Sequence, residues 1–286
     1  MYKPHPLFEC PSDELEIWRY MDLFKFEDIL NYRALYLPRA DKLVKLDEYE
    51  GGLRPAYEEY ISEKLFSANF YEFLCGFGRI DDILITGNKV SDLKKIRERF
   101  MEVYNYFKNN IFVNFWHLNS DENLDMWNEY IYSPPGVAVV SSVGKLKQSL
   151  ETTDIPITLS KVLYTDWENN NIDFNIIFCG AGTFLIILQM LFNKATRYKK
   201  ENELRILCTT LPDDKIYGPL LGGGFNLKRT SGESRLLLPI ESTRLIDKIY
   251  LSPGSTPEFR NEIIHLVSKY IRGFDTTKIV FSKFSK

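Results

Sequence analysis

The pattern of apolar and polar positions switches repeatedly between strand and helix periods, which predicts a mixed α+β protein. Runs rich in β-branched and aromatic residues recur along the chain and are typical of strands. The predicted strands cover residues 15–20, 35–37, 111–118, 137–141, 157–164, 204–208, 236–240 and 245–251. Because most of these runs lie in the second half of the chain, we expect that half to supply most of the sheet.

Apolar residues three and four positions apart predict helices between the strands. The predicted helices cover residues 24–32, a segment that starts at Ser91, residues 121–132 and residues 257–271. Ser91 is a residue type that caps helix N-termini, and Pro257 suits a first helical turn. The run Pro134-Pro135-Gly136 marks the break after the third of these helices.

No Gly/Ser-rich linker, internal repeat or low-complexity tract divides the chain. We therefore expect a single compact α+β domain over residues 1–286, with a mixed or antiparallel sheet and flanking helices. Within it, residues 1–14 are interpreted as an N-terminal extension and residues 53–110 as a helical insertion.

Residues 176–192 form an uncharged apolar run that approaches the roughly 18 residues of a membrane span. The run carries Gly180, Gly182 and Gln189, and its polar flanks lack aromatic anchors. We interpret it as a buried helix and expect no membrane association, with contact to lipid or to a partner chain as the alternative.

The start of the chain and its cysteines favour a cytoplasmic location. Residues 1–16 contain neither the basic nor the apolar region of an export signal. The cysteines Cys10, Cys75, Cys179 and Cys208 are widely separated, so no Cys-x-x-Cys pair exists to hold zinc or exchange disulfides.

Charge and composition exclude one class of function. The chain has 36 Lys and Arg against 39 Asp and Glu, a net charge of -3, which provides no overall attraction for phosphate backbones. A protein that coats DNA without sequence preference is therefore not expected. The 14% aromatic content favours a core and clefts with flat walls for a planar ligand.

The common catalytic motifs are absent from the sequence. His5, His117 and His265 are the only histidines, and none has the spacing of a zinc hydrolase. The sequence also lacks a serine nucleophile elbow and the Gly-x-x-x-x-Gly-Lys-Ser/Thr phosphate loop. No resident metal is predicted.

The first candidate site lies where a helical run gives way to the strand over residues 204–208. It contains Lys194, Tyr198, Glu201, Glu203 and Arg205. In an extended segment residues i and i+2 share a face, so Glu201 and Glu203 can converge on one ligand, with Arg205 next on the same side. The alternative is a charged turn entering an edge strand, with Glu203 and Arg205 paired at the surface, and the bare residues favour that alternative.

Two further groups of residues complete the candidates. Trp127 and Tyr130, at i,i+3 on a helix, can form an aromatic wall over a flat ring or simply pack the helix on the sheet. Ser141 ends the strand that follows. Arg19, beside Tyr20 in the first predicted strand, either extends to solvent or binds an anion inside a cleft.

The order of these pieces resembles the bacterial family catalogued as domain of unknown function 2971, from about residue 18 to residue 270. The resemblance is carried by Arg19-Tyr20 and then by Met126-Trp127-x-x-Tyr130, Gly136, Lys194, Tyr198, Glu201, Glu203 and Arg205. Some members of this family lie near phage-defence genes. The resemblance therefore implies a cytoplasmic defence effector with a partner from a defence system.

The layout is also similar to the ADP-ribosyltransferase superfamily, which implies a split sheet and NAD as the substrate. By this resemblance Arg19 would hold the ribose or phosphate of NAD, and Ser141 or Tyr130 would line the nicotinamide pocket. Glu203 would be catalytic, and Glu201 would position the acceptor nucleophile. The remaining cofactor-binding candidates are Tyr20, Trp127, Lys194, Tyr198 and Arg205.

Three functions therefore compete. The first is an NAD-dependent ADP-ribosyltransferase or NAD glycohydrolase, a toxin or phage-defence effector that acts on a protein or nucleic acid. It expects Arg19, Tyr130 or Ser141, and Glu203 to converge on one cleft. The second is a non-catalytic sensor or adaptor of a defence system, which expects the two glutamates to pair with Arg205 or Lys194 without an adjoining pocket. The third is a metal-dependent nuclease, less expected than the other two, that uses carboxylates such as Asp166, Glu201 and Glu203 with magnesium while Lys194 assists phosphate binding.

Overall fold

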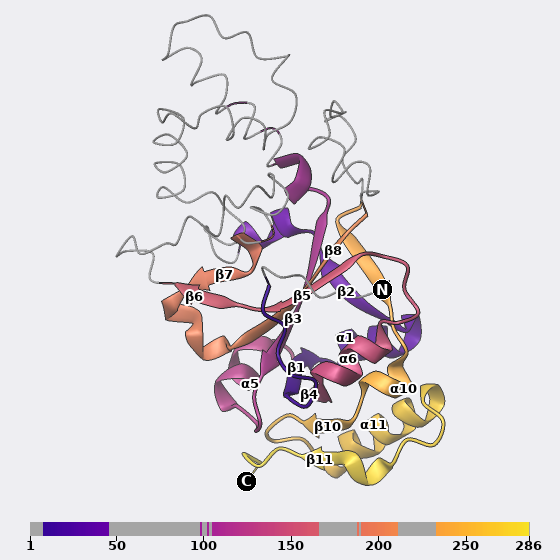
Figure 1. Cartoon of the computed structure of the whole chain (residues 1–286). Helices are drawn as coiled ribbons and strands as arrows, with labels where there is room; N and C mark the ends of the chain where they lie inside the picture. The colour runs from indigo at the N-terminus through magenta and orange to yellow at the C-terminus, as the bar shows by residue number, and fades with distance from the viewer. Residues whose placement is uncertain are drawn as a thin grey trace, which may run out of the picture.

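The structure is a computed structural model that describes residues 8–45, 105–165, 190–210 and 233–285, together with residues 98, 102 and 188 (Figure 1). It is a mixed α+β protein with a seven-stranded main sheet and flanking helices, which confirms the predicted class. Most of the predicted insertion over residues 53–110, including its helix from Ser91, lies outside the described residues. So does most of the apolar run over residues 176–192.

The main sheet has the strand order β11-β10-β4-β1-β3-β8-β5. In that order the strands are β11 (Ile279–Phe281), β10 (Lys248–Leu251), β4 (Gly136–Ser142), β1 (Glu16–Asp22), β3 (Ile111–Leu118), β8 (Glu203–Thr209) and β5 (Ile157–Lys161). All neighbours pair antiparallel except β10 and β11, which are parallel, so the sheet is mixed.

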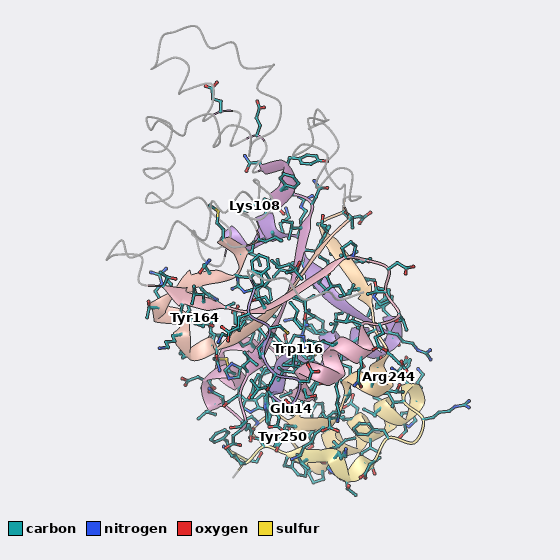
Figure 2. All side chains as sticks on the ribbon, viewed as in Figure 1. Glu14, Lys108, Trp116, Tyr164, Arg244 and Tyr250 are labelled. Carbon is teal, nitrogen blue, oxygen red and sulfur yellow. The ribbon has the colours of Figure 1, made fainter. Side chains whose placement is uncertain are left out.

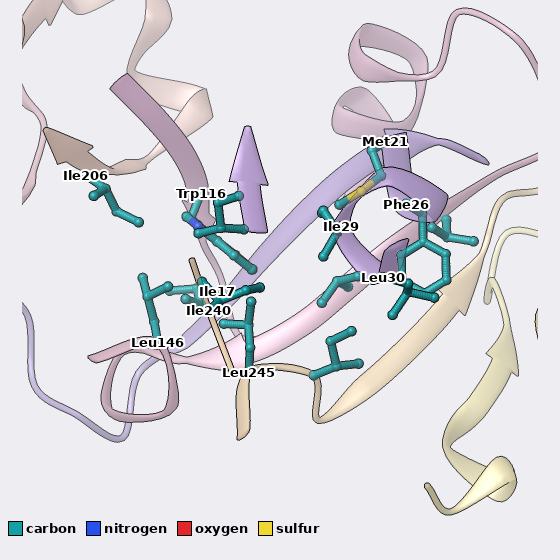
Figure 3. Close-up of a cluster of buried hydrophobic side chains, with 14 of the residues drawn as sticks. Ile17, Met21, Phe26, Ile29, Leu30, Trp116, Leu146, Ile206, Ile240 and Leu245 are labelled. Atoms are coloured by element: carbon teal, nitrogen blue, oxygen red, sulfur yellow. The ribbon is translucent and has the colours of Figure 1, made fainter. Parts of the chain in front are cut away.

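Helices cover both faces of this sheet because alternate strand residues point to opposite sides. Helices α1 (Leu23–Tyr32), α6 (Val143–Ser149), α10 (Ser242–Leu245) and α11 (Pro257–Tyr270) place their apolar residues in the larger core. Figure 3 shows Phe26, Ile29 and Leu30 of α1 facing Ile17 and Met21 of β1 there. On the other face, α5 (Leu124–Tyr130) packs against a smaller core.

Two small ribbons and three short 3-10 helices complete the described part. The first ribbon pairs β2 (Ala34–Pro38) with β9 (Arg235–Pro239), and the second pairs β6 (Leu163–Thr165) with β7 (Asn193–Ala195). The 3-10 helices are η1 (Ala40–Lys45), η3 (Thr196–Glu201) and η5 (Thr276–Lys278).

The ladder between β1 and β3 is short, and the end of this ladder determines where the candidate site lies. It has only two residue pairs, Ile17 with Leu118 and Trp18 with His117, whereas the β3–β8 ladder has seven. Beyond those pairs the neighbour of β3 is β2, since Asn114 Nδ2 donates a hydrogen bond to the Tyr36 carbonyl at 3.0 Å. The sheet therefore opens between β1 and β3.

Several predicted boundaries were wrong for local reasons. The helix expected over residues 121–132 is shorter, because Asn123 caps its start by accepting bonds from the backbone N–H groups of Asp125 and Met126. The strand expected over residues 245–251 begins only at Lys248, after α10. The run over residues 157–164 divides into β5 and β6. Helix α6 and strands β7 and β11 were not predicted.

Among the helices in the described ranges, none is long and apolar enough to cross a bilayer.

Candidate functional site

A cavity of about 570 Å³, here called the central cavity, lies at the opening between β1 and β3. Its walls include Trp18 and Tyr20 from the smaller core and Met21, Ile29 and Trp116 from the larger one, so it reaches both faces of the sheet. Figure 2 shows Trp116 near the middle of the described part. The volume is that of a small-molecule site.

Arg19 is a cation in this cavity whose electrostatic partner among the described residues is the Tyr130 hydroxyl rather than a carboxylate. Its side chain is partly buried and lines the cavity, and its guanidinium carbon lies 5.8 Å from the centre of the Trp116 ring. Its Nη1 atom is buried and makes no hydrogen bond, and among the described residues it pairs with no carboxylate. Burial lowers the pKa of Arg19 to about 10, so it stays charged at neutral pH.

Glu201 and Glu203, here called the carboxylate pair, also line the central cavity. Lys194 Nζ bridges them, at 2.5 Å from Glu201 Oε2 and 3.1 Å from Glu203 Oε1. Arg205 Nε donates to the other Glu203 oxygen at 2.6 Å. Neither cation is among the residues that line the cavity, and all four side chains are buried. The predicted alternative of a surface pair between Glu203 and Arg205 is therefore wrong.

The two carboxylates converge by a different backbone route from the predicted one. Glu201 ends the 3-10 helix η3, Asn202 adopts a left-handed conformation with φ 40°, and Glu203 begins β8. An uninterrupted extended segment is thus absent between the two glutamates. The turn at Asn202, a residue type that tolerates this conformation, brings Glu201 back toward Lys194 instead.

The surroundings of the two carboxyl groups shift their pKa values in opposite directions. Burial, reinforced by the neighbouring charge of Glu203, raises the pKa of Glu201 to about 8. Burial alone would raise the pKa of Glu203 too, but the charge of Arg205, the bond with Glu201 and the charge of Lys194 outweigh it and hold that pKa at about 2. At neutral pH the pair therefore holds an ionised Glu203 beside a largely protonated Glu201.

Aromatic rings form a second wall of the cavity. Tyr20 stacks near Trp18 with 6.1 Å between ring centroids, and its hydroxyl accepts the backbone N–H of Asn123 at 2.9 Å. Trp127 lies behind Tyr20, edge to face at 4.9 Å, and donates its indole N–H to buried Glu122 at 2.6 Å. Trp127 is thus a supporting residue, outside the cavity wall.

His117 is a cavity residue that the sequence interpretation missed. It pairs with Trp18 on β1 and with Glu203 on β8. Its Nδ1 hydrogen-bonds the backbone carbonyl of Glu201, while its Nε2 atom is buried and has no hydrogen-bond partner in the described part of the chain. No motif marks it, because only the strand register brings a lone histidine beside the carboxylate pair.

The structure brings together some predicted site residues and separates others. Arg19, Tyr20, Tyr130, Glu201 and Glu203 line the central cavity. Lys194 and Arg205 stand behind the carboxylates, and the Tyr198 ring lies 4.6 Å from Lys194 Nζ, so these three support the site. Ser141 lies on β4 opposite Ile17, buried in the sheet and outside the cavity wall.

Within the described ranges, no group of three or more His, Cys, Asp or Glu side chains is arranged to hold a metal ion. Asp166, a carboxylate named for the nuclease alternative, lies outside those ranges.

Comparisons with family models, with curated proteins and with solved structures found no match to this chain. The resemblances to the domain of unknown function 2971 family and to the ADP-ribosyltransferase superfamily stay predictions.

Proposed function

We propose that this protein is an NAD-dependent ADP-ribosyltransferase or NAD glycohydrolase, a toxin or phage-defence effector that acts on a protein or nucleic acid. One observation carries the proposal: Arg19, which pairs with no carboxylate among the described residues, and the ionised carboxylate of Glu203 line the same aromatic-walled cavity. When NAD loses nicotinamide, positive charge develops on its ribose. The reaction therefore needs a cation to bind the diphosphate and a carboxylate to stabilise the ribose.

In this mechanism Glu203 acts on the reacting sugar. The bond between ribose C1′ and the pyridinium nitrogen breaks, and the electron pair leaves with neutral nicotinamide, so no proton is needed for departure. Positive charge develops on the ribose, and the Glu203 carboxylate stabilises it. Lys194 and Arg205 keep that carboxylate ionised and fixed.

Glu201 suits the second half of the reaction. The acceptor hydroxyl, or water in the hydrolytic reaction, forms a new bond to C1′ and gives up one proton. A carboxylate with a pKa of about 8 is close to the optimum for a base at physiological pH. Its ionised form takes that proton while the acceptor attacks.

The adaptor alternative is supported only in part by the same residues. It expects the glutamates to pair with Lys194 and Arg205, as they do, but without a pocket beside them. Both glutamates instead line the central cavity. A protein that only docks a partner has no use for an unpaired, partly buried arginine in such a cavity.

The test is incubation of the purified protein with NAD and cell lysate, following nicotinamide release and ADP-ribose transfer. We expect Glu203→Gln to lower turnover by about 10²–10³-fold, the usual effect of removing one electrostatic stabiliser. We expect Arg19→Met to weaken NAD binding by about tenfold or more, because it removes a charged donor.

The matched control is Glu122→Gln. Glu122 is also a buried carboxylate, which accepts bonds from Trp127 and from the backbone of Lys283, but it lies outside the cavity wall. This variant should keep turnover. Absence of NAD binding and turnover in a folded wild-type protein would overturn the proposal and favour the adaptor.

A further inference from the structure

Exposed apolar side chains gather at the mouth of the central cavity. In the described part of the chain nine large apolar side chains are exposed, and four of them line that cavity: Phe24, Tyr32, Tyr36 and Leu237. Single exposed apolar residues are ordinary, whereas a group around one opening indicates a contact surface. These four residues and the exposed charged residues of the cavity wall, Lys25, Asp28 and Arg235, are here called the rim.

Two elements hold the rings of the rim, and each presents them on one face. On α1, Phe24 and Tyr32 lie eight residues apart, so they share a helix face and are about 12 Å apart along its axis. On the β2–β9 ribbon, Tyr36 and Leu237 are direct partners, and Arg235 shares their face because it lies two residues before Leu237. Rings spread in this way suit an extended molecule better than one small ring.

A second group of cations lies beside the carboxylate pair. The 3-10 helix η3, which ends at the first of the two glutamates, exposes Arg197, Lys199 and Lys200. Helix α5 connects this group to the cavity, since Lys200 Nζ lies 3.9 Å from Glu129 and the next residue of α5, Tyr130, lines the cavity wall. The exposed charged residues of the rim and η3 are five cations and one carboxylate, in a chain whose net charge is -3.

Lys25 connects the rim to the segment that follows α5. Its Nζ lies 5.5 Å from the centre of the Phe24 ring and 5.4 Å from that of Tyr132, a further exposed ring. The same atom is 3.6 Å from buried Asp22, yet 46% of the lysine side chain stays exposed, so a surface ligand can still reach it. Cations and exposed rings are therefore neighbours at this part of the rim.

We propose that the rim and η3 form the docking surface for a single-stranded nucleic acid, whose bases stack on the exposed rings and whose phosphates contact the cations. A ring can stack on any base, and Lys and Arg attract a phosphate backbone, so this combination is typical of single-strand binding. A duplex keeps the faces of its bases inside the stack and cannot use the rings. The local excess of cations favours this polyanion over a protein partner.

This inference rests on the proposed function for its consequence, because it names the acceptor of the transfer. A strand on the rim lies at the mouth of the cavity that the carboxylate pair lines. Its acceptor group forms the new bond to ribose C1′ and gives its proton to Glu201, as nicotinamide leaves with the electron pair of the broken bond. Docking itself needs neither NAD nor turnover, so the two proposals can fail separately.

Binding is measured by fluorescence anisotropy on the full chain without NAD. The probes are a short DNA strand of mixed sequence, the RNA strand of the same sequence, the DNA duplex and a polyglutamate peptide of equal charge. We expect a single strand to bind about tenfold or more tightly than the duplex or the peptide, because only the strand offers unpaired bases to the rings. A preference for DNA or RNA identifies the sugar of the partner.

Two variants separate the rings from the cations. Tyr32→Ala should weaken strand binding about 5-fold or more, the effect of one lost stacking contact. Arg235→Gln should lower the slope of log affinity against log salt by about 0.7, the effect of one lost phosphate contact. The matched controls are Phe281→Ala and Arg244→Gln, which change an exposed ring and an exposed arginine outside the rim and η3 and should leave binding unchanged. Unfolding temperatures verify that every variant is folded.

Three results overturn the inference while the proposed function stands: folded wild type turns over NAD but binds no strand, the two rim variants bind the strand as wild type does, or the acidic peptide binds more tightly than the strand. The last result would assign the surface to a protein partner. If the strand binds at the rim but the protein neither binds nor cleaves NAD, the proposed function fails, and the role of the strand as acceptor fails with it while the docking surface stands.

Discussion

Replacing Arg205 with methionine tests whether the network behind the carboxylate pair is as constrained as the structure indicates. Arg205 is fully buried, donates to Glu203 at 2.6 Å and donates to the Leu191 carbonyl at 2.5 Å. Methionine fills much of the space but leaves Glu203 with Lys194 as its one charge partner among the described residues. Removal of one partner of a buried ion pair costs about 3–5 kcal/mol, because the other charge stays buried.

The pKa of Glu203 gives this prediction a second signature. In the folded wild type this pKa is about 2, below its ordinary value of 4.5, so the interaction stabilises the protein fully above pH 4.5. The stabilisation is lost as the pH falls from 4.5 toward 2 and the carboxylate is protonated. Without Arg205 the pKa of Glu203 rises, so the stability gap between variant and wild type should narrow in the same window.

The assay is thermal unfolding of wild type and Arg205→Met at neutral pH and at several pH values below 4.5. At neutral pH the expected fall in unfolding temperature is on the order of 10 °C. Arg244→Met is the matched control, since Arg244 is an exposed arginine paired with Glu151 at 3.3 Å and Glu241 at 2.8 Å. Such a surface pair contributes at most about 1 kcal/mol. Equal losses for the two variants would refute the reasoning.

Two other predictions concern the base and the sheet. The rate of nicotinamide release at low NAD should rise as the pH passes through about 8, where Glu201 ionises. Glu201→Gln should remove that rise. A wild-type rate that stays constant from pH 6 to 9 would contradict the role of Glu201 as the base. Gly136→Ala should destabilise the fold by about 1–3 kcal/mol, because the added Cβ would lie 2.8 Å from the Met21 carbonyl oxygen. Denaturant unfolding measures this loss, and an unchanged free energy of unfolding would argue against that contact.

Local patterns predicted the elements whose own residues determine them. The run over residues 111–118 matches β3 at both ends, and the helix that begins at Pro257 ends one residue earlier than expected. In both cases the hydrophobic period is strong and the end signals lie within the segment. Helix α6 carried a readable signal as well, since Ser142 caps it by accepting from Lys145, but the preceding strand obscured that start.

The site was less predictable because its members depend on contacts between distant segments. Glu203 and Arg19 were candidates from their local pattern and took their roles from a resemblance, whereas nothing in the sequence around His117 suggests a ligand contact. Ser141 shows the opposite case. It lies near the end of a strand with the expected pattern, yet it pairs with Ile17 away from the opening, and it is not among the residues that line the cavity.

Strand register explains why the central cavity lies where it does. One row across the sheet runs from Val140 to Trp18, His117 and Glu203, and the β1–β3 ladder ends at the Trp18–His117 pair of that row. The cavity therefore begins where hydrogen bonding between the two strands stops, with the carboxylate of Glu203 one strand farther along. Since β1 and β3 are about 90 residues apart, a one-residue shift in their pairing would turn His117 to the opposite face and separate it from Trp18. The chemistry proposed for this protein thus depends on the register of two residue pairs.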